Sequence, residues 1–162
     1  MNKFNIVALF CQDIREEKND VVSLIGILSD NIQTPKVIPD EQGVVLSSLR
    51  QLSSLHIYLR INFDPDFDLP EANMRVILPT DEVIEVGKIP ADVIAQARSQ
   101  AKETGLPLAG VISRLGIGNF ALPKPGLLRF EVVLGDESHL AGMLNFKILE
   151  EATSSSDSAR PS

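Results

Sequence analysis

Apolar and polar residues alternate with a period of two in several parts of the chain, which predicts a protein built mainly of β-strands. In the clearest case, 54–63, every second residue from Leu55 to Phe63 is apolar. Successive side chains of a strand point to opposite faces, so one face of this strand packs on a core and the other is at least partly wet. The segment 127–134 alternates in the same way. We therefore predict that Leu59 and Phe130 lie in one core between two sheets.

The first 28 residues predict a β-hairpin. The apolar runs 4–11 and 21–28 flank the charged stretch 13–20, which is too polar to bury and predicts a turn. The next stretch, 31–43, contains Pro35, Pro39 and Gly43, a composition that favours an extended loop. The segment 44–52 is compatible with a short strand or with one turn of helix.

Further strands are predicted in the second half of the chain. The segments 73–78 and 82–86 flank a turn at 79–81. The apolar segment 108–117 contains glycines, typical of a strand that bends or bulges near its end. A turn at 119–126 then leads into strand 127–134, and 139–149 is the last strand.

One helix is predicted, from about Pro90 to Thr104. Proline suits the first turn, Asp92 lies near the positive end of the helix dipole, and Gly105 is a typical stop. Its apolar stripe is narrow and half alanine, so we expect this helix at the rim of the sheets.

Seven or eight short strands with one helix predict a mainly β protein, an antiparallel immunoglobulin-like or C2-like β-sandwich. A Pro-Gly entry into the last hairpin resembles immunoglobulin-like sandwiches, but Leu127 and Leu128 replace the tyrosine of a tyrosine corner. The sandwich is expected to form a single domain over 1–150. The Ser-rich segment 151–162 has no periodicity and is predicted to be a disordered tail.

Charge and composition narrow the classes of partner. The chain of 162 residues has a net charge of −7, which opposes binding to nucleic acid or to anionic membrane surfaces. A single cysteine cannot form an internal disulfide, in agreement with a reducing compartment, and we expect a cytoplasmic protein. The apolar run before Cys11 is short and lacks the small residues of a cleavage site, so a secretion signal is not expected. No cofactor is implied.

An acidic loop is the first candidate site. Asp64, Asp66, Asp68 and Glu71 place oxygen ligands at near-alternate positions, as Ca²⁺ prefers, and sandwich loops can present such ligands. Pro65 and Pro70 stiffen the backbone, however, and the glycine of an EF-hand loop is absent. A solubilising acidic loop, or a contact for a basic partner, accounts for the same residues.

The charged turn of the hairpin is the second candidate site, with Asp13, Arg15, Glu16 and Glu17. Asp13 could accept backbone N–H bonds of the turn, and Arg15 could clamp a neighbouring loop through a carboxylate. The alternatives are a ligand or partner contact and a solvated turn with weak ion pairs.

A nucleophile and base formed by Cys11 with His56 or His139 is the third and weakest candidate. A lone cysteine at the end of an apolar strand is usually a small buried hydrophobe.

The stretch from Cys11 to Gly26 carries a resemblance to a family. Cys11, the Asp-Ile-Arg-Glu-Glu run from Asp13 to Glu17 and the Ser-Leu-Ile-Gly strand ending at Gly26 resemble the opening of an uncharacterised bacterial family of small cytoplasmic proteins. Gln12 departs from that pattern, because it replaces the first of two consecutive acids. The resemblance implies no known activity.

We therefore expect a non-catalytic intracellular binding or accessory module that contacts another protein through loops or an exposed strand. The alternative is a Ca²⁺-dependent or small-ligand-binding sandwich that uses the acidic loop 64–71. A hydrolytic enzyme is a third and more distant alternative.

Overall fold

The computed structural model describes residues 3–35, 51–121 and 124–149. The predicted tail 151–162, the second half of the predicted loop 31–43 and most of the ambiguous segment 44–52 lie outside the described residues. In chain order the described elements are β1 (Phe4–Glu16), the 3-10 turn η1 (Lys18–Asp20), β2 (Val22–Ile27), β3 (Asn31–Pro35), β4 (Gln51–Phe63), β5 (Ala72–Ile77), β6 (Val83–Ile89), α1 (Ala91–Thr104), β7 (Ala109–Ala121), β8 (Gly126–Leu134) and β9 (Glu137–Leu149).

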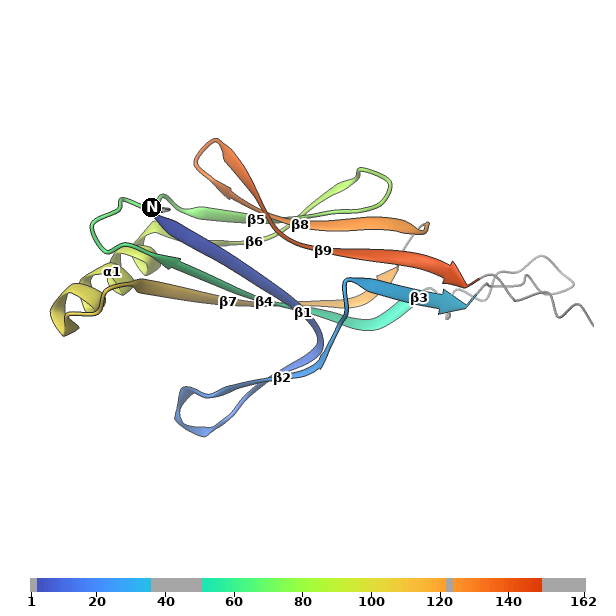
Figure 1. The fold of residues 1–162 in the computed structure, drawn as a ribbon, viewed down its shortest axis with the longest axis horizontal. Coiled ribbons are helices and arrows are strands. Elements are labelled where there is room, and N and C mark those ends of the chain that lie inside the picture. Colours follow the sequence, from blue (N-terminus) through green and yellow to red (C-terminus); the bar gives the residue numbers. More distant parts are fainter. Residues whose placement is uncertain (1–2, 36–50, 122–123, 150–162) are drawn as a thin grey trace, which may run out of the picture.

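The strands form two sheets, as predicted for a β-sandwich (Figure 1). The first sheet has the order β2-β1-β4-β7, and the second has the order β3-β9-β8-β5-β6. All pairs are antiparallel except β3 with β9, which run parallel. The predicted fold class is thus confirmed, with one parallel pair that the sequence pattern did not indicate.

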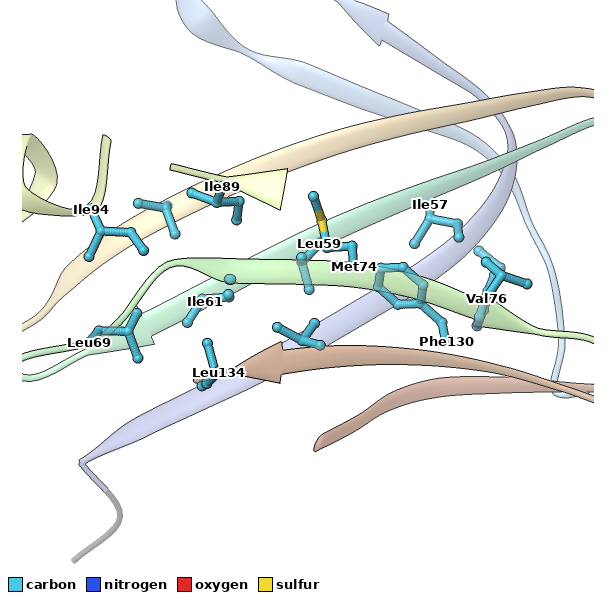
Figure 2. Packing of buried hydrophobic residues seen from close by; sticks show 14 of the residues in the cluster. Ile57, Leu59, Ile61, Leu69, Met74, Val76, Ile89, Ile94, Phe130 and Leu134 are labelled. Atoms are coloured by element: carbon cyan, nitrogen blue, oxygen red, sulfur yellow. The ribbon is translucent and has the colours of Figure 1, made fainter. Parts of the chain in front are cut away.

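The core lies between the inner faces of the two sheets and consists of aliphatic and phenylalanine side chains (Figure 2). The alternating residues of β4 and β8 point inward, and Leu59 and Phe130 are both fully buried in one cluster, as predicted. The ring of Phe130 meets that of Phe10 edge to face, with centroids 6.5 Å apart. Strands from both sheets therefore share one continuous core.

The helix α1 lies at one end of the sandwich (Figure 1). Pro90 precedes its first turn, and Gly105 ends it in the left-handed conformation with φ 67°. Only Ile94 and Ala101 are buried on this helix, and they join the core next to β7. The narrow apolar stripe thus places the helix at the rim, as expected.

Several predicted boundaries were wrong, and two of these errors lie in the first 35 residues. β1 continues through Asp13 to Glu16, so the predicted turn 13–20 is reduced to its last residues around η1. The predicted loop at 31–43 begins with a strand, β3, which pairs with β9 at the edge of the second sheet. Pro35 ends this strand, and an edge position tolerates a residue that lacks a backbone donor.

A polar cluster ties three strands together on the second sheet. Arg75 donates to Oε2 of Glu131 from Nη2 at 2.8 Å and from Nε at 3.0 Å. The hydroxyl of Ser138 donates to the same oxygen at 2.7 Å. These bonds favour the ionised carboxylate, and the pKa of Glu131 is lowered, chiefly by Ser138 and then by Arg75. The cluster links β5, β8 and β9 on a side of the sheet that is otherwise open to water.

Candidate functional site: the hairpin cleft

The end of β1 and the start of β2 leave the first sheet together and form a hairpin arm, defined here as residues 13–25. The pairing of β1 with β4 ends at Cys11 and His56, whereas the pairing of β1 with β2 continues from Asp13 to Glu16. The hydroxyl of Ser54 donates to the carbonyl of Gln12 at 2.8 Å, a contact just where β1 leaves β4. In Figure 1 the arm turns back beneath β4 and β7.

The tip of the arm is a tight turn. The amide of Glu17 donates to the carbonyl of Val21 at 2.7 Å, and Asn19 adopts the left-handed conformation with φ 62°. Asparagine tolerates this conformation better than most residues. The charged sequence thus suits a tip in water, which the hydrophobic pattern alone did not distinguish from an ordinary loop.

A cleft separates the arm from the outer face of β7 and is called here the hairpin cleft. A cavity of about 180 Å³ is lined by the arm residues Glu16, Glu17, Val21 and Val22 and by Ile112 and Arg114 of β7. A wider and shallower hollow of about 490 Å³ adjoins it, lined by Ile14, Glu16, His56, Arg114, Leu115 and Gly116. The smaller cavity is thus lined by three aliphatic and three charged side chains.

One ion pair crosses the hairpin cleft, between Glu16 on the arm and Arg114 on β7. The Arg114 side chain is 40% exposed and that of Glu16 is 71% exposed, so water weakens their attraction. The pair acts as a latch between arm and sheet that a ligand could displace at little cost. Glu17 has no ion-pair partner among the described residues and leaves one negative charge at the cleft.

The outer face of the first sheet continues the apolar surface beyond the cleft. The strand registers place Val7, Arg60 and Ile112 in one row and Leu9, Tyr58 and Arg114 in the next. Val7, Leu9 and Ile112 are all exposed, and Ile112 keeps 50% of its surface in water. Arg60 and Tyr58 lie between the β1 pair and Ile112, so this face mixes apolar and polar side chains. Apolar patches rimmed by polar residues are one mark of an interaction surface.

The predicted role of Arg15 needs correction. Arg15 does not clamp a neighbouring loop, because its Nε donates to Oδ2 of Asp13 two residues away on the same strand, at 2.9 Å. This hydrogen bond is the main reason why the pKa of Asp13 is lowered. Asp13 and Arg15 belong to the base of the arm, whereas Glu16 and Glu17 line the hairpin cleft.

Two of the four acids of the acidic loop pair with cations of the helix. Asp68 accepts from Arg98 at 2.9 Å, and Asp66 pairs with Lys102 at 2.8 Å, both cations lying on α1. Oδ1 of Asp64 accepts the backbone N–H of Asp66. In the described parts of the chain, no three histidine, cysteine, aspartate or glutamate side chains gather closely enough to hold a metal ion. Two of the predicted metal ligands thus serve as a clip between loop and helix.

The proposed nucleophile is buried. Cys11 is fully inaccessible, and its sulfur lies 3.8 Å from the backbone oxygen of His56, its partner across the β1–β4 pair. Burial raises the pKa of the Cys11 thiol, which opposes formation of the reactive thiolate. His139 belongs to the other sheet, where its ring meets Phe4 edge to face at 5.1 Å. Burial and the raised pKa both oppose a nucleophilic role for Cys11.

Sequence reasoning missed the sheet side of the cleft. Ile112 and Arg114 lie almost a hundred residues from the arm, and only the register of β1, β4 and β7 brings them near it. The one available signal was that the apolar segment 108–117 contains a single charged residue, Arg114.

In comparisons with known proteins, no family model and no curated protein matches the chain. The resemblance of the first hairpin to a bacterial family therefore stays a prediction. Among the described residues, no helix combines the length and the apolar character that crossing a lipid bilayer requires.

Proposed function

We propose that this protein is a non-catalytic binding module that contacts another protein through the hairpin cleft and the adjoining outer face of the first sheet. The observation that carries the proposal is that Val7, Leu9 and Ile112 are exposed on one face of the first sheet, beside a projecting arm. Val21 on the arm adds to it, with 55% of its surface exposed. Burying such side chains against a partner is favourable, because the apolar area leaves water.

The chemistry of the cleft supports binding more than catalysis. Its charged groups are the latched pair Glu16 and Arg114 and the single carboxylate of Glu17, without a hydroxyl or thiol nucleophile on the walls. A general base needs a reacting group within hydrogen-bond reach, and a nucleophile needs a base beside it. Shape, apolar contact and charge are what this surface offers a partner.

The experiment compares the intact chain with two charge-reversed variants as bait in extracts of the source cell. Glu17→Lys changes the cleft, and Asp136→Lys makes the same change of charge on the exposed turn between β8 and β9. We expect the Glu17→Lys variant to lose a protein that the wild type and the Asp136→Lys variant retain, measured by quantitative mass spectrometry.

Thermal unfolding of both variants is measured alongside, because Glu17 and Asp136 are exposed and neither substitution should unfold the protein. If all three baits retain the same proteins in the same amounts, the cleft is not the binding surface and the proposal fails.

A further inference from the structure

Among the described strands, four lie at the edges of the two sheets, and they are not equally protected against pairing with another chain. Three of them are blunted: β2 has six residues and Gly26 at φ 62°, and β3 has five residues and ends at Pro35. The third, β6, has seven residues and its register with β5 is broken between Met74 and Arg75. Short, bulged or proline-ended edges are the usual means of preventing a further strand from adding.

The fourth edge strand, β7, is neither short nor bulged, and it does not end in proline. It spans 13 residues, contains no proline, and stays in one register with β4 from Ala109 to Ala121. Arg114 is its single charged residue, and Glu16 compensates that charge. An edge strand that is long and regular presents a row of backbone N–H and C=O groups to another strand.

The hairpin arm covers the same stretch of β7. Glu16, Glu17, Val21 and Val22 face Ile112 and Arg114 across a cavity of about 180 Å³. Side chains of an added strand would alternate between this cleft and the side of Leu115, which packs against the core. The position under the arm thus specifies what each face of the added strand should carry.

We propose that an extended segment of a partner protein adds to the free edge of β7 as one more strand of the first sheet, beneath the hairpin arm. Its chemistry is an alternation of apolar residues, on the side of Leu115, with basic residues, on the side of Glu16 and Glu17. The inference rests on the proposed function and deepens it by naming the kind of partner.

Charge decides between this occupant and a second copy of the chain. Glu17 has no ion-pair partner in the described residues, and the whole chain carries −7. A basic segment is attracted to this site, whereas a second copy brings the same negative charge and the same acidic arm. Electrostatic complementarity of this kind chooses partners and speeds their association.

The test uses a fluorescein-labelled decapeptide of alternating valine and lysine as the probe, and fluorescence anisotropy as the readout. The control peptide has the same ten residues in two blocks, five lysines and then five valines, so that it keeps the charge and loses the strand pattern. We expect the wild-type protein to bind the alternating peptide at least about tenfold more tightly than the block peptide.

Two protein variants with the same change of charge locate the site. Ile112→Lys puts a positive charge on β7, and Leu140→Lys puts one on β9, both at exposed positions. We expect Ile112→Lys to weaken binding about tenfold or more, and Leu140→Lys to change it by less than about twofold. Ile112→Thr keeps a neutral β-branched residue and controls for damage to the strand.

Hydrogen exchange identifies the edge directly. Bound peptide should slow exchange of alternate amides between Val111 and Ile117, because those N–H groups gain partners. The proposal is overturned if the block peptide binds equally well, or if peptide binding slows exchange elsewhere but not in β7. It is also overturned if β7 is protected without peptide in a dimer seen by sedimentation, since a second copy is then the occupant.

Failure of this inference is distinguishable from failure of the proposed function. Suppose that the Glu17→Lys bait loses a captured protein and that the alternating peptide does not bind. The hairpin cleft is then still a binding surface, but strand addition to β7 is refuted.

Discussion

Truncating Phe130 to alanine tests the packing between the two sheets. The Phe130 ring is fully buried, lies opposite Val76 on β5 and meets Phe10 of the first sheet edge to face. Loss of a buried phenylalanine side chain costs about 3 to 5 kcal/mol, and an edge-to-face pair contributes about 0.5 to 1.5 kcal/mol beyond its buried area.

The cavity left by Phe130→Ala would not refill easily. Its neighbour across the β8–β9 pair is Gly142, which has no side chain to move into the space. A Cβ added at Gly142 would already lie only 2.8 Å from Cε2 of Phe10. We therefore expect the loss of free energy of unfolding to fall in the upper part of the range, about 4 to 5 kcal/mol.

The assay is urea unfolding followed by far-ultraviolet circular dichroism, because the chain has no tryptophan for fluorescence. A loss of about 4 kcal/mol corresponds to a fall in melting temperature of roughly 8 to 16 °C for a chain of this size. Arg129→Ala is the control, since Arg129 is partly exposed and pairs with the exposed carboxylate of Asp81 at 3.3 Å, so the variant should lose less than about 0.5 kcal/mol. Equal losses at the two positions would refute the assignment of inner and outer faces.

The remaining predictions concern Glu131 and Gly26. Glu131→Gln should lower the free energy of unfolding by about 1 to 2 kcal/mol at pH 7, because it weakens charge-assisted hydrogen bonds. The folded-state pKa of Glu131 is lowered, so its stabilisation is present above about pH 4.3 and is lost as pH falls through the folded pKa. The difference between wild type and variant should therefore vanish in acid, and a constant difference would contradict the lowered pKa. Gly26→Ala should cost about 1 kcal/mol or more, since φ is 62° and the new Cβ would lie 2.5 Å from Oε1 of Gln12. Gly105→Ala is the control, because Gly105 has φ 67° and no atom within 4 Å of the added Cβ, so that only the backbone conformation contributes to its cost. A larger shift of the unfolding midpoint at Gly105 than at Gly26 would refute the clash with Gln12.

The fold was predictable where one face of a strand is buried. In β4 and β8 the buried residues alternate strictly, and that pattern alone assigned Leu59 and Phe130 to the core. β3 was not predictable, because it is short, ends in proline, and is held by pairing with a strand more than a hundred residues later. The alternation of apolar and polar residues indicates which face of a strand is buried. It says little about which distant strand pairs with it.

The candidate site was only half predictable. Charge marked Glu16 and Glu17 at the arm, but nothing local to Ile112 or Arg114 indicates that β7 forms the opposite wall. The ion pairs between the acidic loop and α1 were predictable, because Arg98 and Lys102 are four residues apart. That spacing places two cations on one face of a helix. The spacing was therefore a reason to expect ion pairs between loop and helix in place of a metal site.

The parallel pairing of β3 with β9 has a consequence for synthesis of the protein. The side chains of Asn31 and Asn145, 114 residues apart, are joined by a hydrogen bond of 3.1 Å. In the second sheet β9 lies between β3 and β8, so β3 has no neighbour until the last described strand has left the ribosome. Closing so long a loop is entropically unfavourable until the contacts that reward it can form. During translation β3 therefore lacks its partner β9 and is exposed to other chains and to chaperones. The second sheet is completed only after β9 has been synthesised.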